Sequence, residues 1–133
     1  MILDILRNNG YKLEEDFSKE VAKAETILGI TFAKDYREAL AKFGNFEVNN
    51  HEFTGVQFEN YLNIVVATVD NREYCHEDTT KMYVIEELGV DGIAIWQNSK
   101  GEIFQTIPRK EVKPEKIYDT FLEYLENEVL DSK

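Results

Sequence analysis

The side chains best suited to chemistry lie in one run, Cys75-His76-Glu77-Asp78. Thiolate, imidazole and carboxylate groups all bind metals, but ligands that share one ion usually come at spacings such as C-x2-C or H-x3-H. Directly adjacent side chains point in divergent directions in a helix or a strand. The run therefore predicts a polar, solvated loop and no metal site.

Nucleophilic catalysis by the cysteine would need a histidine base within hydrogen-bond reach. Because Cys75 and His76 are adjacent and do not naturally face each other, the one pair to consider is Cys75 with His51, brought close by folding. The glycines form neither G-x-G-x-x-G nor G-x-x-x-x-G-K, so no phosphate-binding loop is indicated.

Carboxylates are abundant, with 26 aspartates and glutamates in 133 residues. At this density, neighbours such as Glu14-Glu15 and Glu86-Glu87 arise by chance. General acid catalysis needs a desolvated carboxyl group rather than a run of surface charge. We therefore interpret these pairs as surface charge and expect a protein that is not an enzyme and needs no cofactor.

One group of acids is a better candidate for binding a partner, because its members share a short segment in which only Arg72 opposes them. Tyrosines flanked by polar residues are candidate anchors, whereas Trp96 and Tyr124 fall among apolar residues and are expected in the core. The predicted partner-binding residues are Asp70, Glu73, Glu77, Asp78, Tyr61 and Tyr74. A merely solvated turn is the alternative interpretation of the acids.

The chain as a whole is acidic, with 15 lysines and arginines, a net charge of −11 and a pI near 4.6. Such a surface repels phosphate, so neither nucleic acid nor an anionic membrane is an expected partner. The longest apolar runs, 64–67 and 93–96, are far shorter than the roughly 20 residues of a membrane span. The N-terminus lacks the features of a signal peptide, so we expect a cytoplasmic protein.

Helices are predicted in the N-terminal half. Residues 18–28 have helical apolar spacing, with Ser18 as candidate cap and Gly29 as the stop; the face comprises Val21, Ala24, Ile27 and Leu28. A second helix is expected from residue 34 or 35 to 43, and a strand over residues 52–58. Residues 63–74 are ambiguous, since the β-branched run 64–66 favours a strand and Asn63 favours a helix cap; we choose the helix.

The C-terminal half is predicted to contain strands followed by one helix. Strands are expected over residues 82–86 and 93–97, and a hairpin turn at 98–101 leads into a third at 103–107. Four apolar residues at steps of four indicate an amphipathic terminal helix: Ile117, Phe121, Leu125 and Val129. The order of elements predicts one α+β domain over residues 1–133, with N-terminal helices, a central mainly antiparallel sheet and a C-terminal amphipathic helix.

Residues 24–44 read AETILGITFAKDYREALAKFG, and this run resembles the opening signature of the SUKH superfamily. Later landmarks follow in order over nearly the whole chain: FTGV at 53–56, NIVVAT at 63–68, GIAIW at 92–96 and FLEYL at 121–125. The chain departs from the usual pattern at Ala33, where a proline is common, and at 43–45, where an asparagine-glycine pair is common.

The resemblance implies function by binding. Bacterial members are mostly immunity proteins that block a polymorphic toxin, often a nuclease, through a tight protein–protein complex, and fungal relatives act as interaction modules in cell-wall signalling. The acidic charge agrees, because an inhibitor of a basic cleft gains speed and selectivity from carboxylates. The expected partner is thus a basic toxin domain, and the alternative is a non-enzymatic interaction module in stress or cell-envelope regulation. Neither interpretation fixes an oligomeric state.

Overall fold

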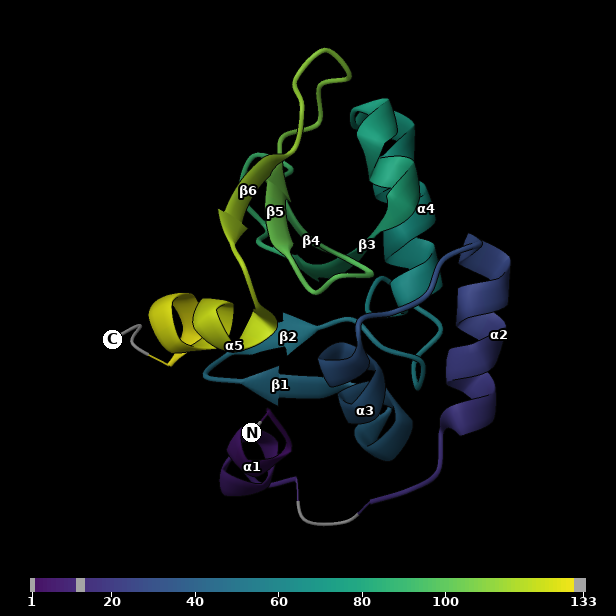
Figure 1. The fold of residues 1–133 in the computed structure, drawn as a ribbon, viewed down its shortest axis with the longest axis vertical. Helices are drawn as coiled ribbons and strands as arrows, with labels where there is room; N and C mark the ends of the chain where they lie inside the picture. Colours follow the sequence, from purple (N-terminus) through teal and green to yellow (C-terminus); the bar gives the residue numbers. More distant parts are fainter. Residues whose placement is uncertain (1, 12–13, 131–133) are drawn as a thin grey trace.

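The computed structural model describes residues 2–11 and 14–130 and shows an α+β fold (Figure 1). The helical elements described are α1 (Ile2–Asn8), α2 (Ser18–Leu28), α3 (Lys34–Phe43), α4 (Ile64–Tyr74), η1 (Glu77–Lys81), α5 (Phe121–Tyr124) and η2 (Leu125–Val129). The strands are β1 (Phe46–Val48), β2 (His51–Phe53), β3 (Met82–Glu87), β4 (Ala94–Asn98), β5 (Ile103–Thr106) and β6 (Glu115–Tyr118). All pairings within these strands are antiparallel, and β3 to β6 lie side by side in chain order. The predicted fold class is confirmed.

Helices α2, α3 and α4 form where the sequence predicts them. At the end of α2, Gly29 adopts φ 67° and its N–H donates to the carbonyls of Glu25 and Thr26, a left-handed stop that suits glycine. The ambiguous segment is a helix, since Asn63 Oδ1 accepts hydrogen bonds from the N–H groups of Val65 and Val66. The cap satisfies two backbone N–H groups that have no partner within the helix. The apolar side chains of residues 64–66 carry no acceptor that could replace it.

Two details of the α2 prediction are wrong. Ser18 is the first residue of the helix rather than its cap, and its N–H donates to the Asp16 carboxylate at 3.0 Å. Ile27 is 57% exposed. Because successive residues turn by about 100° around a helix, the side chain of Ile27 points away from the side on which Val21 is buried. Ala24 and Leu28 share the buried side with Val21.

A hairpin of β1 and β2 replaces the single strand predicted over residues 52–58. Asn49 and Asn50 have φ of 49° and 67°, the two positive values that a tight two-residue hairpin turn requires. The strand ends at Phe53 because the chain must then pass the end of α3: a Cβ on Gly55 would lie 1.9 Å from the Gly44 carbonyl oxygen. Only glycine tolerates that approach.

The two chain ends also differ from expectation. Residues 2–8, assigned to no element from the sequence, form α1, and Ile2 and Leu6 enter the core one turn apart. Ile117 belongs to strand β6 rather than to the terminal helix. That helix starts after Thr120, whose hydroxyl accepts a hydrogen bond from the Glu123 N–H.

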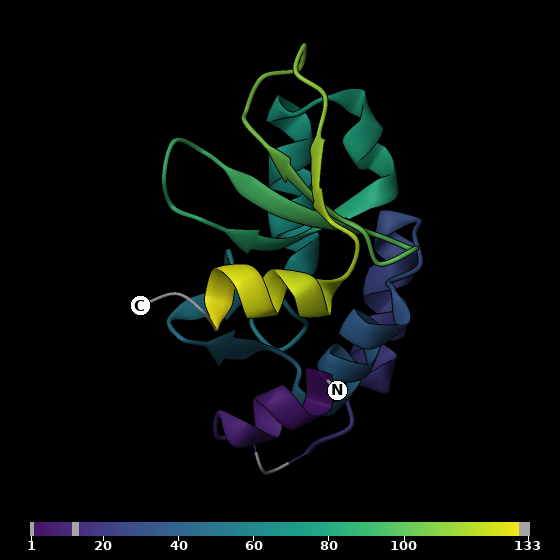
Figure 2. The same cartoon turned by 60° about the vertical axis from the view of Figure 1, so that its left-hand side comes forward.

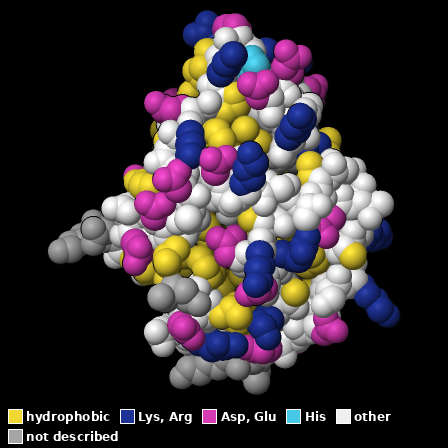
Figure 3. All heavy atoms as spheres, viewed as in Figure 1, with side chains coloured by type: hydrophobic (Ala, Val, Ile, Leu, Met, Phe, Trp, Pro, Cys, Tyr) yellow, Lys and Arg dark blue, Asp and Glu magenta, His cyan; other side chains and the backbone are white. Residues whose placement is uncertain are grey.

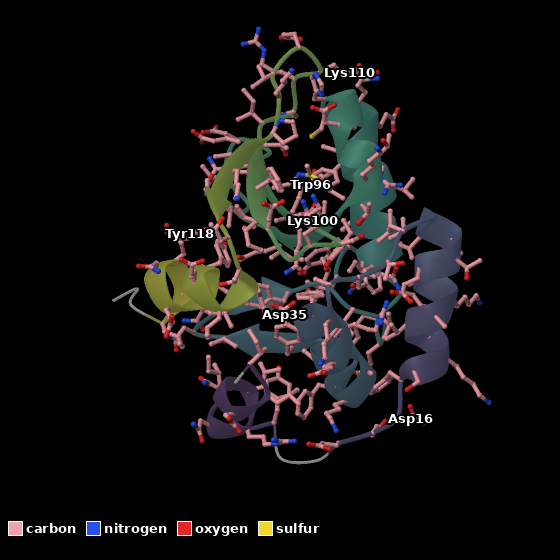
Figure 4. All side chains as sticks on the ribbon, viewed as in Figure 1. Asp16, Asp35, Trp96, Lys100, Lys110 and Tyr118 are labelled. Atoms are coloured by element: carbon pink, nitrogen blue, oxygen red, sulfur yellow. The ribbon has the colours of Figure 1, made fainter. Side chains whose placement is uncertain are left out.

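The sheet has a different core on each side. Helix α5 lies beside the β1–β2 hairpin in Figure 1, and Figure 2 shows it between the hairpin and the sheet. This side holds the larger cluster, with Tyr36, Phe53 and Phe121 fully buried. Helix α4 covers the other side over a smaller cluster, in which Trp96 lies between the sheet and the helix (Figure 4). The expected burial of Trp96 and Tyr124 is confirmed.

Candidate functional site

Helix α4 and the turn η1 carry the four predicted acids. Asp70, Glu73, Glu77 and Asp78 are all exposed. Apolar surface accompanies them, because the side chain of Tyr74 is 59% exposed and that of Val69 is 52% exposed. An aromatic ring beside carboxylates is a combination that protein interfaces use, since the ring supplies buried area and the charges supply orientation.

Arg72, the one cation within this acidic segment, turns away from the acids. Its guanidinium donates to the carbonyls of Thr79, Thr80 and Met82, at 3.2, 3.1 and 2.9 Å. Burial lowers the pKa of Arg72. These bonds hold η1 and the start of β3 against α4, so Arg72 positions the acidic segment instead of neutralising it.

Cys75 and His76, adjacent in sequence, have separate structural roles. Cys75 is buried, and its thiol lies 3.5 Å from the Thr106 hydroxyl and 3.7 Å from the Ile107 carbonyl, which fastens the end of α4 to β5. His76 Nδ1 accepts a hydrogen bond from the Asp78 N–H and so caps η1. Among the described residues, no three histidine, cysteine, aspartate or glutamate side chains gather where they could hold a metal ion.

Basic side chains border this acidic surface. Figure 3 shows acidic side chains interspersed with lysine and arginine at the upper end of the molecule, and Figure 4 places Lys110 there, near the end of α4. The surface is therefore a local group of carboxylates with a mixed-charge border rather than one edge of a uniform negative field.

Tyr61 does not join the other five predicted residues. It precedes α4, whereas Tyr74 ends it, so the helix of 11 residues separates them by about 15 Å. Tyr61 is 57% exposed and lines a separate cleft of about 550 Å³ with His51, Glu87 and Leu88. The predicted set thus occupies two places on the molecule.

A buried polar group behind this cleft was overlooked in the sequence. Glu86 is only 4% exposed, and its carboxylate lies 2.6 Å from His51 Nδ1 and accepts a hydrogen bond of 2.5 Å from the Tyr124 hydroxyl. Burial raises the pKa of Glu86 against the opposing effects of these two partners. Glu86 is therefore not surface charge, whereas Glu87 is exposed as expected, and His51 is committed to Glu86 rather than to Cys75.

A register shift in β3 explains the position of Glu86. Val84 lies opposite Trp96, but Glu86 lies opposite the next residue back along β4, Ile95. This bulge puts Glu86 on the side of the sheet that faces α5. Glu87 then faces α4, where its carboxylate accepts a hydrogen bond of 2.9 Å from Asn71. The arrangement ties the hairpin and α5 to the sheet, a structural role for the desolvated carboxyl group.

Comparison with known proteins identifies the family. A protein-family model described as SUKH_6, SMI1-KNR4 cell-wall, matches residues 18–125. The chain belongs to this SUKH family. The matched part runs from α2 to the start of η2, and it includes the acidic segment, both sides of the sheet and the His51–Glu86–Tyr124 group.

Family membership confirms the resemblance seen in the sequence and supports, in general terms, an immunity-protein or SMI1/KNR4-like role. The family is generally a non-enzymatic module that acts through protein partners. No curated protein matches the chain. Among the described residues, no helix has the length and apolar character needed to cross a membrane.

Proposed function

We propose that this SUKH protein is a cytoplasmic immunity protein that binds a cognate bacterial polymorphic toxin and neutralises it through protein–protein contact. The observation that carries the proposal is the acidic surface of α4 and η1, formed by Asp70, Glu73, Glu77 and Asp78, which remains unneutralised by Arg72 because that guanidinium bonds to backbone carbonyls. Tyr74 supplies an apolar anchor at the same place.

A basic toxin domain is the partner that this surface suits best. A nuclease must present positive charge to hold phosphate, and carboxylates on an inhibitor compete for the same cleft. The net charge of −11 adds long-range attraction, which raises the rate of encounter. A nuclease toxin is therefore the target class that we propose.

Co-expression tests the proposal. A candidate toxin domain, chosen from the genes that neighbour this one, is produced in a sensitive cell with the native protein, and survival and co-purification are scored. We expect protection and a stable complex. Charge reversal of Asp70, Glu73, Glu77 and Asp78 to lysine should weaken both, and loss of protection with an intact complex would contradict masking by binding.

A second candidate function is an interaction module in stress or cell-envelope regulation, which the cell-wall description of the family favours. The same surface would then engage a regulatory protein of the cell itself. The co-expression experiment separates the two, because a regulatory module gives no protection against a toxin.

A further inference from the structure

A second binding feature lies away from α4, in a pocket of about 480 Å³. It is lined by residues from the end of α3, from the β1–β2 hairpin, from the segment at Tyr11, Glu15 and Phe17, and from the loop at residues 57–62. Six aromatic residues line it: Tyr11, Phe17, Phe43, Phe46, Phe53 and Phe58. Phe43, Phe46 and Phe53 are buried in the core, whereas Tyr11 and Phe17 are partly exposed and Phe58 is exposed. The ring of Phe58 is 44% exposed, so part of this apolar wall is open to an incoming group.

Three glutamates line the same pocket, Glu15, Glu47 and Glu52, and Glu52 also lines the cleft at Tyr61. Each of these residues is exposed, and none of the three carboxylates has an ion-pair or hydrogen-bond partner among the described residues. Lys42 also lines the pocket, but its ammonium group lies 3.4 Å from a carboxylate oxygen of Glu14, outside it. The pocket therefore combines aromatic residues with carboxylates that pair with no side chain in the described part of the chain.

The hairpin register makes this charge costly to the fold. Glu47 lies directly opposite Glu52 in the β1–β2 pair, and like charges in that position destabilise a sheet. The flanking pairs, Phe46 with Phe53 and Val48 with His51, face the core and fix the register. The two glutamates are thus held together on the outer face of the hairpin, where a bound cation would relieve their repulsion.

We propose that this pocket takes an arginine side chain from a protein partner. The aliphatic stem and the flat guanidinium would pack on the aromatic wall, and the guanidinium can donate to two carboxylates at once. The cleft at Tyr61 lacks the aromatic wall, and neither it nor the aromatic pocket is lined by Asp70, Glu73, Glu77 or Asp78. The proposal rests on the proposed function in that the partner is a protein, and it assigns a contact separate from α4.

Short blocked peptides test the pocket without any toxin. The full chain, labelled with 15N, is titrated with acetyl-Gly-Arg-Gly-amide, with the citrulline peptide of the same shape but no charge, and with the norleucine peptide. We expect the arginine peptide to shift the amide resonances of Glu47, Glu52 and Phe58 with a Kd on the order of 1 mM, and the citrulline peptide to bind at least about tenfold more weakly. Equal binding of citrulline or norleucine, or no shift at these amides, would overturn the assignment.

Matched variants locate the binding. The double variant Glu47→Gln, Glu52→Gln should weaken binding of the arginine peptide by about tenfold, while Glu73→Gln, Glu77→Gln on α4 and η1 should leave it unchanged. Removal of the like charges should leave the midpoint of thermal unfolding the same or raise it, so lost binding cannot be attributed to unfolding. An equal loss of arginine-peptide binding in both double variants would show that only net charge matters and would overturn the assignment of the pocket.

These results are separable from the immunity proposal. Failure of the peptide titration rejects the pocket while toxin protection through α4 can still be observed. Failure of protection rejects the immunity role while the peptide result still stands.

Discussion

The two sides of the four-stranded sheet are built differently. Toward α5 and the hairpin, aromatic rings contact one another edge to face, as Phe121 does with Tyr36 and Phe53 at centroid distances of 5.2 and 5.4 Å. Toward α4, the buried cluster is smaller, and polar bonds such as Trp96 Nε1 to the Thr106 hydroxyl, at 2.7 Å, supplement it. Stability is therefore expected to depend most on the first side.

The difference leaves the outer face of α4 available for binding. A helix fastened by Arg72, Asn71 and Cys75 to the sheet needs none of its exposed side chains for packing. Exposed residues such as Asp70 and Glu73 can then change with little effect on folding. The comparison thus predicts that stability and partner binding can be altered independently.

The largest expected effect is on the α5 side. Phe121→Ala should lower the free energy of unfolding by about 3–5 kcal/mol, because the ring is fully buried among other aromatics. Urea unfolding followed by circular dichroism measures the loss. Ile27→Ala, at a side chain 57% exposed, is the control and should change stability by less than about 0.5 kcal/mol. A loss under about 1 kcal/mol at Phe121 would mean that α5 does not organise this core.

A smaller effect is expected where α4 is fastened to the sheet. Arg72→Leu keeps the aliphatic stem but removes the donors to the carbonyls of Thr79, Thr80 and Met82, and should cost about 1–3 kcal/mol. Amide hydrogen exchange should accelerate first in η1. If Arg72 instead acts by pairing with the neighbouring acids, Arg72→Lys will restore stability, and the positioning role is wrong.

The pH dependence of stability tests the buried carboxyl group. Because burial raises the pKa of Glu86 in the folded state, the folded protein binds this proton more tightly than the unfolded chain does, and the stability from Glu86 falls as pH rises from about 4.5 through the raised pKa. Glu86→Gln lacks this loss, so its stability relative to the native protein should increase over that range in urea unfolding series.

A background that lacks His51 provides the control for Glu86. The same comparison in His51→Asn protein separates the carboxyl group from the imidazole 2.6 Å away. Adding Glu86→Gln to this background should change the pH dependence of stability as it does in the native protein. A difference that vanishes would assign the pH dependence to His51.

Sequence patterns predicted the elements whose information is local. Asn63 and Gly29 mark helix ends through their own bonds and conformation, and the apolar runs of β3, β4 and β5 reflect burial on both sides of the sheet. Strand β6 was not predicted, because Ile117 and Phe121 are four residues apart and so fit the spacing of a helix. The helix in fact starts only after Thr120.

The candidate site was less predictable, because its parts depend on contacts distant in sequence. The bulge that buries Glu86 follows from pairing with β4, and the aromatic pocket joins segments from residues 11 to 62. The exposure of Tyr74 and of the α4 acids could be predicted from the polar residues around them. The distance between Tyr61 and Tyr74 is instead set by the helix α4 that lies between them. A signal was present for the pocket: Glu47 and Glu52 flank the turn-forming Asn49-Asn50 pair symmetrically, as opposed residues of a hairpin must.

The most direct test of the central claim is the association rate constant with the toxin domain, measured by stopped flow at low and high salt. One variant reverses the exposed acids Asp70, Glu73, Glu77 and Asp78 to lysine, and a control variant with the same change in net charge reverses the exposed acids Glu20, Glu38, Glu115 and Glu126. For the native protein, association should slow at least several-fold as salt shortens the range of attraction, with much less change in dissociation. At low salt, the α4 variant should reproduce that slowing and the control should retain most of the native rate. Equal slowing by both variants, or native association that does not depend on salt, would contradict recognition through the acidic surface of α4 and η1.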